Sequence, residues 1–383
     1  MDSPPPASDV APSDVARSLP KSLNDPGLDT PCLLIDLETL AANVGRMAAL
    51  ARRSRVRLRP HAKTHKSAQI ARMQLEAGAT GICVATVGEA EVLRAAGMED
   101  ILVAYNIVGD AKLARLLPLC ADGGITLTAD SLEVAEGYCR MAAAAGRTLP
   151  VLLEIDSGMR RTGAPPQMAG QLGSKIAALT GIELIGILTH AGHAHDVTAQ
   201  PDIEAVARQE AAAMAQARDE LDRQGIPVQV VSAGSTITAP YLNADDGITE
   251  IRPGTYVFND LRTLEMYACT SDQIAATILT TVVSVGADRV VLDCGNKTLT
   301  MTSTEQHGYG KIKNRPLSNF VRLSEEHGVA TLGTGDDELR VGDRVQVLPI
   351  HICVCVDLQQ QAYGVRRGQI AELIRIDAAR RSR

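Results

Sequence analysis

The sequence of 383 residues carries a net charge of −7, with 22% charged and 45% hydrophobic side chains. Since it has no basic excess, we expect no nucleic-acid partner. No apolar run approaches the roughly 18 residues that a membrane-spanning helix requires, and the start Met1–Pro6 lacks the basic and apolar regions of a secretory signal. We therefore expect a soluble, cytoplasmic protein that does not bind a membrane.

Residues 1–28 are rich in Pro, Ser and Asp and predict a loose N-terminal arm. The chain as a whole has 2% aromatic residues and no Trp, which predicts an aliphatic core. The eight cysteines show no paired spacing, and several lie in apolar, strand-like segments, where a buried free thiol is the ordinary outcome. In the cytoplasm we expect them to stay reduced.

Strand-like and helical segments alternate from Thr30 to Gly234. The predicted strands are Cys32–Asp36, Val56–Arg59, Gly81–Ala85, Asp100–Tyr105, Ile125–Ala129, Pro150–Asp156, Leu184–His190 and Val228–Gly234. Stretches with helical spacing lie between them, such as Leu37–Arg53, Ser67–Gly78, Gly88–Gly97 and Asp202–Gly225. This alternation favours an α/β fold, a (β/α)₈ TIM-type barrel over residues 29–260. A doubly wound sheet is the alternative, but it would normally have fewer strands and a Gly-rich phosphate loop after the first strand.

The character of the sequence changes beyond Asp260. The segments Ile274–Val285, Arg289–Asp293, Arg344–Val356 and Gln361–Val365 are β-rich, and helical periodicity is weak. We expect residues 261–383 to form a smaller, mainly β C-terminal domain, joined by part of the N-terminal arm.

A barrel places functional groups just after the C-terminal ends of its strands. The polar motifs of this chain fall at such points. Lys63 follows the second predicted strand, Asp156 and Arg161 the sixth, His190 and His193 the seventh, and Ser235 and Thr236 the eighth.

Lys63 lies in the basic motif Pro60–Lys66, between His61, His65 and Lys66. Neighbouring cations lower the pKa of a lysine, and a neutral amine is what a Schiff-base lysine needs to attack an aldehyde. A solvated basic loop is the alternative, but the position of Lys63 at a barrel strand end favours the reactive lysine.

His351 and Cys353 alternate along the strand-like run Val347–Val354, so we expect both side chains on one face. Imidazole and thiolate both bind transition metals. Taken alone, the pair also fits a satisfied histidine beside a buried thiol. A metal site next to a reactive lysine would indicate chemistry on an amino acid.

Small-residue turns occur at Val231–Thr236 and Arg252–Tyr256. Backbone amides and hydroxyl groups in such turns can hold a phosphate, which in many barrels binds after the last two strands. Ordinary tight turns are the alternative. Arg161 has the chemistry to bind an anionic ring oxygen, although it could equally be a surface arginine.

Together these motifs carry a family resemblance. The matching stretches are Thr30-Pro31 with Ile35–Leu37, Arg59–Lys66, Val87–Glu91, Leu188–His193, Val231–Thr236, Arg252–Phe258, Leu323–Gly328 and His351–Cys353, in the family's order. With them the chain resembles the fold-type III pyridoxal phosphate enzymes of the D-threonine aldolase and D-serine dehydratase group, whose barrel is similar to that of alanine racemase.

The resemblance implies roles for individual residues. Lys63 would form the internal aldimine with pyridoxal 5'-phosphate, and His351 and Cys353 would hold a divalent metal (zinc, manganese, cobalt or magnesium). The remaining cofactor ligands would be Gly254, Thr255, Tyr256, Ser235 and Thr236 at the phosphate, Arg161 at the phenolic oxygen and His190 near the ring. Enzymes of this group are usually dimers, so we expect a homodimer.

The expected function is that of a lyase acting on small D-β-hydroxy amino acids, a low-specificity D-threonine aldolase. The alternative is a D-serine or D-3-hydroxyaspartate type of dehydratase, because His-x-Cys is the metal motif familiar from D-serine dehydratases, while the best-known bacterial aldolases have His-x-Asp. A non-catalytic pyridoxal phosphate carrier and a racemase fit less well, since neither needs a metal pair. His193, His65 and His195 all remain open as the second base.

Overall fold

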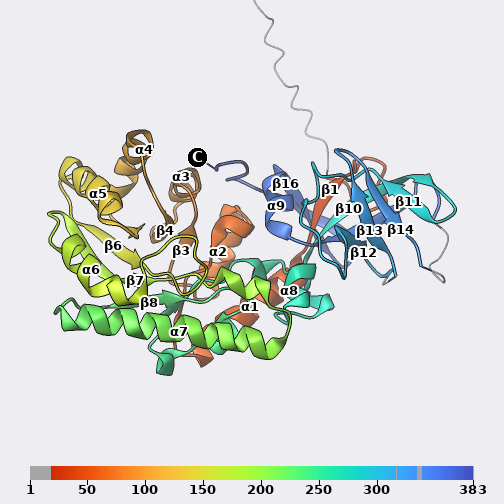
Figure 1. Cartoon of the computed structure of the whole chain (residues 1–383). Coiled ribbons are helices and arrows are strands. Elements are labelled where there is room, and N and C mark those ends of the chain that lie inside the picture. Colours follow the sequence, from red (N-terminus) through yellow and green to blue (C-terminus); the bar gives the residue numbers. More distant parts are fainter. Residues whose placement is uncertain (1–18, 316, 334–338, 383) are drawn as a thin grey trace, which may run out of the picture.

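The protein, seen in a computed structural model that describes residues 19–315, 317–333 and 339–382, contains two sheets (Figure 1). An eight-stranded parallel sheet has the order β2-β9-β8-β7-β6-β5-β4-β3. A nine-stranded sheet lies beside it and is built mainly from the C-terminal part of the chain. The first part of the expected N-terminal arm, residues 1–18, lies outside the described residues.

The parallel sheet is a TIM-type barrel, which confirms the predicted fold class. Its strands are β2 (Arg57–Leu58), β3 (Ile82–Val84), β4 (Ile101–Asn106), β5 (Ile125–Ala129), β6 (Leu149–Glu154), β7 (Ile182–Leu188), β8 (Val230–Ala233) and β9 (Glu250–Ile251). A parallel bridge between His61 and Cys83 joins the two ends of the sheet, because the chain beyond β2 continues alongside β3.

The prediction of the first barrel strand was wrong. Cys32–Asp36 forms β1, which pairs with β10 and β16 of the other sheet, and the eighth barrel strand is the two-residue β9. The apolar run of β1 predicts a buried strand but does not identify its partners. β9 is too short to give a periodicity signal. The functional groups still follow barrel strands, with Lys63 after the first.

Helices alternate with the barrel strands. They are α1 (Leu37–Arg53), α2 (Ala68–Glu76), α3 (Val87–Ala95), α4 (Asp110–Cys120), α5 (Leu132–Ala145), α6 (Ala169–Ala177) and α7 (Gln200–Arg223). Local sequence sets their starts: the Asp36 carboxylate accepts a hydrogen bond from the Thr39 amide at 2.8 Å and caps α1, and the Thr86 hydroxyl caps α3 through the Glu89 amide.

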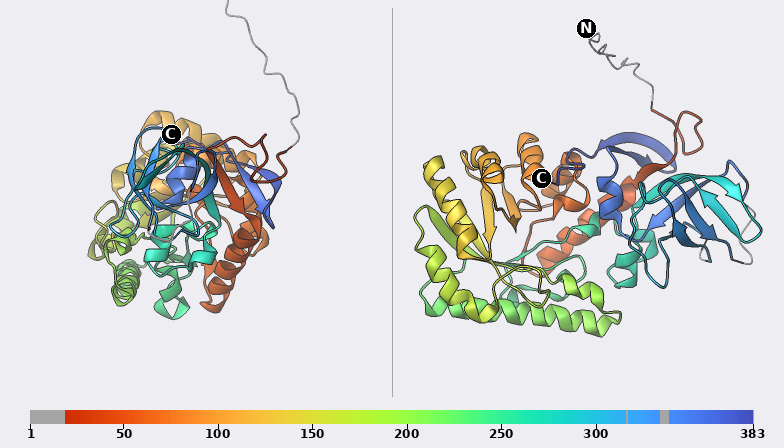
Figure 2. Two further views of the ribbon diagram at one scale, coloured as in Figure 1. Left: turned by 90° about the vertical axis from the view of Figure 1, so that its right-hand side faces the viewer. Right: turned by 45° about the horizontal axis from the view of Figure 1, so that its top comes forward.

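The second sheet confirms the predicted mainly β C-terminal part. It combines β1 with β10 (Ala276–Val285), β11 (Arg289–Leu292), β12 (Gly310–Ile312), β13 (Asn319–Leu323), β14 (Gly328–Thr331), β15 (Arg344–Pro349), β16 (Gln361–Arg366) and β17 (Gln369–Arg375). Two short helices complete this part: α8 (Leu261–Glu265) lies between β9 and β10, and α9 (Ile352–Asp357) lies between β15 and β16. Figure 2 shows the barrel and this sheet side by side, with the C-terminal end of the chain running back to the barrel.

The interior is aliphatic, as the composition predicts. The main cluster of buried side chains runs from barrel residues such as Leu40 and Ile101 to Ile278 and Val347 of the second sheet. The cysteines are all free thiols, and Cys83, Cys294 and Cys355 are fully buried. Within the part of the chain that the structure describes, no helix is both long and apolar enough to cross a bilayer.

Candidate active site

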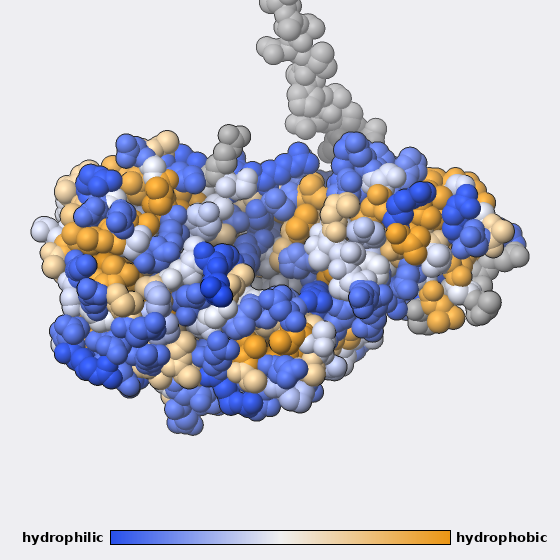
Figure 3. Space-filling model, viewed as in Figure 1, coloured by the Kyte–Doolittle hydropathy of each residue, from blue (hydrophilic) through white to orange (hydrophobic). Residues whose placement is uncertain are grey.

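A cavity of about 1390 Å³ lies between the C-terminal ends of the barrel strands and the second sheet. The face seen in Figure 3 is hollowed between these two parts. Most of the residues singled out from the sequence line this cavity: Lys63, Arg161, His190, His195, Ser235, Thr236, Gly254, Thr255, His351 and Cys353. His65, His193 and Tyr256 are not among the lining residues.

Lys63 projects from a short 3-10 turn, η1 (Ala62–Thr64), directly after β2. The His61 ring accepts a hydrogen bond from the Lys63 amide at 3.4 Å, and the His61 amide bonds to Pro253 beyond β9. Burial lowers the pKa of His61 well below its ordinary value, with the Lys63 charge acting in the same direction. His61 is therefore neutral at pH 7.

Lys66, the other expected cationic neighbour, is paired with the carboxylates of Glu89 and Asp357. Its positive charge is therefore compensated. The sequence predicted that uncompensated cations around Lys63 make it reactive. The folded chain does not surround Lys63 with such cations.

His65 is directed away from the cavity into the barrel wall. Its Nδ1 accepts the Ser67 amide at 3.1 Å, so its Nε2 donates to the Gln74 side-chain oxygen at 3.1 Å. Burial lowers the pKa of His65 to about 4. With both ring nitrogens bound inside the protein, His65 has a structural place and does not reach the cavity.

Tyr256 is also buried behind the cavity. Its hydroxyl accepts a hydrogen bond from Gln74 at 2.9 Å, and its amide donates to the Thr236 hydroxyl at 3.1 Å. Neither group is directed to a ligand, but the second bond fixes the turn after β8 against the turn after β9. Tyr256 thus supports the two turns from behind.

The turn at Gly254 is packed against the lysine turn. A Cβ at Gly254 would lie 3.0 Å from the Thr64 hydroxyl and 3.1 Å from the His61 carbonyl oxygen. These contacts are tighter than ordinary packing, so only glycine fits without displacement. Thr255 and Ser235 line the same cavity as Lys63.

The three histidines after β7 have different surroundings. His190 lines the cavity, and burial lowers its pKa well below the ordinary value. His193 is packed behind Gly158, and its two ring nitrogens are buried without a hydrogen-bond partner among the described residues. His195 lines the cavity, and burial, followed by the charge of Arg262, lowers its pKa.

His351 and Cys353 converge in the cavity, but not along a strand as predicted. β15 ends at Pro349, His351 is the N-cap residue of α9, and Cys353 lies in the first turn of this helix. The Asp260 carboxylate accepts the Ile352 amide at 3.1 Å and so supports the helix start, which the apolar sequence alone does not predict.

The electrostatics of the pair suit a metal. Cys353 raises the pKa of His351 to about 11, and although burial would raise the pKa of Cys353, His351 lowers it below the ordinary value. A lowered pKa favours the thiolate, which is the metal-binding form of cysteine. Asp260 Oδ2 lies 3.4 Å from His351 Nδ1, an arrangement that leaves Nε2 available for a metal.

Residues 19–315, 317–333 and 339–382 contain no group of three or more His, Cys, Asp and Glu side chains arranged for a metal ion. A metal at His351 and Cys353 would therefore have two protein ligands from these residues. Its remaining positions would be open to water or substrate, as in catalytic sites.

Sequence reasoning missed several residues of the cavity wall. Arg252 donates to the Ser232 hydroxyl at 2.7 Å, Arg262 pairs with Glu265 at 3.1 Å, and Lys66 links Glu89 to Asp357. Arg252 and Lys66 lie within the predicted turn and lysine motifs, but their partners come from other segments of the chain, whereas Arg262 pairs within α8.

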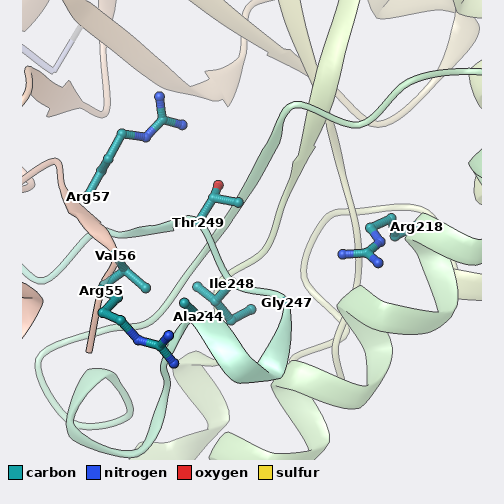
Figure 4. A pocket seen from close by; sticks show the side chains of 8 residues that line it. All are labelled: Arg55, Val56, Arg57, Arg218, Ala244, Gly247, Ile248 and Thr249. Carbon is teal, nitrogen blue, oxygen red and sulfur yellow. The ribbon is translucent and has the colours of Figure 1, made fainter. Parts of the chain in front are cut away.

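A second, more open hollow of about 560 Å³ is lined by Arg55, Arg57 and Arg218 (Figure 4). Each guanidinium has a carboxylate neighbour: Asp245 at 2.5 Å, Glu250 at 4.0 Å and Asp222 at 3.8 Å, respectively. None of the candidate site residues lies there. The chemistry is therefore concentrated in the larger cavity.

Fold and site define an alanine racemase-like barrel with an additional β domain that contributes a His/Cys pair. The family models agree: residues 35–261 match "Alanine racemase, N-terminal domain" and residues 275–365 match "Putative serine dehydratase domain". The chain belongs to the family with an alanine racemase-like N-terminal domain, and within this family to the group of lyases.

Similar proteins include D-threo-3-hydroxyaspartate dehydratase of Delftia sp., 34% identical over 85% of this chain and 91% of the relative. D-threonine aldolase of Arthrobacter sp. is 31% identical over 95% of this chain and 97% of the relative. A mutant of D-threo-3-hydroxyaspartate dehydratase, solved in the metal-free form, has a TM-score of 0.86 at 31% identity and covers 92% of this chain and 98% of its own.

Proposed function

We propose that the protein is a pyridoxal phosphate- and divalent metal-dependent lyase that cleaves D-β-hydroxy amino acids, specifically a D-threonine aldolase that forms glycine and acetaldehyde. The observation that carries this proposal is the convergence of Lys63 with His351 and Cys353 in one cavity. An amine for the cofactor and a ligand pair for a metal come from opposite ends of the chain and line the same space.

The residues present fit pyridoxal phosphate. Lys63 would hold it covalently, while the hydroxyl groups of Ser235 and Thr255, together with the close turn at Gly254, would bind its phosphate. Arg161 would face the phenolic oxygen, and the neutral His190 would lie near the ring. When bound, the cofactor supplies an electron sink for cleavage of a bond at Cα.

The residues also fit a metal. His351 and Cys353 would hold it, and Cys353 favours zinc over magnesium, with manganese and cobalt as further possibilities. When bound, the metal supplies a Lewis acid for the β-hydroxyl group. A relative of this chain that was solved as a metal-free mutant supports metal use within the group.

We assign the second base to His195. Of the three histidines left open by the sequence, it lines the cavity, whereas His65 and His193 are packed behind its wall. Its lowered pKa keeps its imidazole neutral near pH 7 and able to accept a proton. In the aldolase reaction His195 would take the proton of the β-hydroxyl group as the Cα–Cβ bond breaks and the aldehyde carbonyl forms.

A dehydratase is the second candidate, because the metal pair contains cysteine and a dehydratase of Delftia sp. is 34% identical to this chain. In that reaction Lys63 would remove the α-proton and the β-hydroxyl group would leave. Hydrolysis of the product would then give a 2-oxo acid and ammonia. Both reactions use the same lysine and metal pair, so the products decide between them.

The test is an incubation of the purified protein, loaded with pyridoxal phosphate and a divalent metal, with D-threonine. Acetaldehyde and glycine in equal amounts would support the aldolase. Predominant 2-oxobutyrate and ammonia would support the dehydratase instead. Formation of neither pair, with D-threonine or with D-3-hydroxyaspartate, would refute the lyase proposal and favour a carrier or a racemase.

We further propose that the chain works in the cytoplasm as a homodimer. Its two domains would be residues 29–260 and 261–383, and β1, from the first range, would pair within the sheet of the second. Exposed apolar side chains at the cavity rim support the homodimer, because a partner subunit would cover them: Tyr105 is 54%, Tyr267 58% and Val354 42% exposed. Light scattering of the purified protein would measure the assembly state.

A further inference from the structure

Lys66 ends the turn that carries Lys63, and its backbone is held at both sides. Its amide donates to the Ala62 carbonyl at 2.7 Å, and its carbonyl accepts the Ala378 amide at 2.9 Å. The residue has a positive φ of 50°, a conformation that disfavours a lysine. Because the surrounding bonds fix this conformation, the direction in which its side chain leaves the backbone is also fixed.

The Lys66 ammonium lies between two carboxylates. It is 2.6 Å from Asp357 Oδ1 and 3.2 Å from Glu89 Oε1. The side chains of Lys66 and Glu89 are 9% and 3% exposed, whereas Asp357 is 33% exposed. A cation held in this way is not a mobile surface lysine, and since both carboxylates keep it protonated it is not a free base.

The two carboxylates belong to different parts of the protein. Glu89 lies in the first turn of α3 in the barrel, where its second oxygen accepts the Ala85 amide at 2.7 Å. Asp357 is the last residue of α9, the helix that begins at His351 and carries Cys353. Lys66 therefore connects the barrel to the C-terminal end of the helix with the metal pair.

The other end of α9 is attached to the same turn. Cys353 Sγ lies 3.3 Å from the Thr64 hydroxyl, one residue beyond Lys63. The lysine turn and α9 thus meet at two points, Thr64 with Cys353 and Lys66 with Asp357. Two attachments at opposite ends of a short helix restrict its rotation and its sliding, which a single contact would not do.

The C-terminal segment strengthens the second attachment. The Arg380 amide donates to the same Asp357 oxygen at 2.9 Å, and the Arg381 carbonyl accepts the Thr86 hydroxyl at 2.6 Å. In Figure 2 this end of the chain lies next to α3. Asp357 is therefore fixed by a side chain and a backbone group from two different segments.

We propose that Lys66 is a positioning residue: by pairing with Asp357 and Glu89 it holds α9, and with it His351 and Cys353, at a set distance from Lys63. This inference rests on the proposed function, since it gives a role in metal binding to a residue that touches neither the metal nor the reacting atoms. Loss of the Asp357 link should loosen the metal pair while Lys63 keeps its place in η1.

The test compares Asp357→Asn with the unaltered protein. The dissociation constant of Zn²⁺ is measured by competition with a chromophoric chelator, and bound pyridoxal phosphate by its visible absorbance. We expect Zn²⁺ to bind about 10- to 100-fold more weakly, as for other residues that orient metal ligands, with the cofactor band unchanged. Asp357→Glu, which keeps the charge, should restore most of the affinity.

The matched control is Glu326→Gln, which removes a carboxylate from the exposed pair with Lys297 on the second sheet. It should leave Zn²⁺ binding unchanged. Lys66→Met should weaken Zn²⁺ binding as Asp357→Asn does. This variant also leaves buried Glu89 without its cation, which disfavours folding. Because Asp357 is partly exposed, Asp357→Asn remains a valid test if Lys66→Met does not fold. Zn²⁺ affinity of Asp357→Asn within about twofold of the unaltered protein would overturn the inference.

Failure of the proposed function has a different signature. A protein that binds Zn²⁺ and pyridoxal phosphate but forms no lyase product would refute the reaction and leave the affinity comparison intact. A protein whose unaltered form binds no Zn²⁺ would overturn both.

Discussion

Arg59 and Glu250 form a buried ion pair that joins the first and last strands of the barrel. Arg59 Nε lies 2.9 Å from Glu250 Oε2, and the other guanidinium nitrogens form two bonds to Asp100, at 2.7 and 3.0 Å. The side chains of Arg59 and Glu250 are 10% and 1% exposed. The pair lies beside β2 and β9, the two shortest strands, and so reinforces the part of the barrel with the fewest ladder hydrogen bonds.

We predict that Arg59→Met lowers the free energy of unfolding by about 3–5 kcal/mol, because it leaves the Glu250 charge buried without its partner. Urea unfolding followed by circular dichroism measures this. Arg57→Met is the control, since Arg57 is 44% exposed and 4.0 Å from Glu250, and a pair of this kind contributes less than about 1 kcal/mol. Equal losses in the two variants would contradict the prediction.

The stability of the protein should fall in acid through His65. Its pKa is about 4 in the folded protein and 6.5 in the unfolded chain, so between these values the unfolded chain binds a proton that the folded protein does not. Unfolding is therefore favoured as the pH falls from 6.5 to 4, by up to about 3 kcal/mol. His61 and His190 act in the same direction.

The measurement is the free energy of unfolding at several pH values between 7 and 4. His65→Asn, which keeps an acceptor for the Ser67 amide but does not titrate, should give a flatter curve in this window. The same slope in His65→Asn and in the unaltered protein would exclude His65 as the source.

Gly254→Ala should weaken binding of pyridoxal phosphate by about tenfold to a hundredfold while the protein remains folded. The added methyl group would press on Thr64 and His61, and overpacking of this kind costs about 1–3 kcal/mol. Titration of the apoprotein with pyridoxal phosphate gives the affinity. Gly45→Ala, in the exposed part of α1 with no atom within 4 Å of the new methyl group, should leave the affinity unchanged.

The sequence predicted most of the barrel because its strands are short apolar runs that alternate with amphipathic helices. It predicted the cavity position of Lys63, His190 and Ser235 because a barrel collects the residues that follow its strands. β1 shows the limit of this reasoning: its apolar pattern would suit either sheet, and its pairing with β10 and β16 depends on residues more than two hundred positions away.

The same limit applies to the site. The sequence predicted that His351 and Cys353 share a face because they alternate along a strand. The two residues do meet, but at the start of α9, and this helix start depends on Asp260. Nothing in the local sequence separates His65, bound to Gln74, from His195 in the cavity wall. Which polar residue of a motif faces a ligand is decided by long-range hydrogen bonds that a motif does not contain.

Removal of the metal should abolish lyase activity without removing the cofactor. We expect chelation with EDTA to lower kcat with D-threonine by at least about a hundredfold, because the β-hydroxyl group loses its Lewis acid, while the visible cofactor band remains. Cys353→Ala should reproduce this loss and bind Zn²⁺ weakly. Its neighbour on α9 provides the control: Cys355 is fully buried and its thiol faces the His351 carbonyl at 3.5 Å, so Cys355→Ala should keep Zn²⁺ binding. Full activity after chelation would show that the His351 and Cys353 pair does not serve the reaction through a metal.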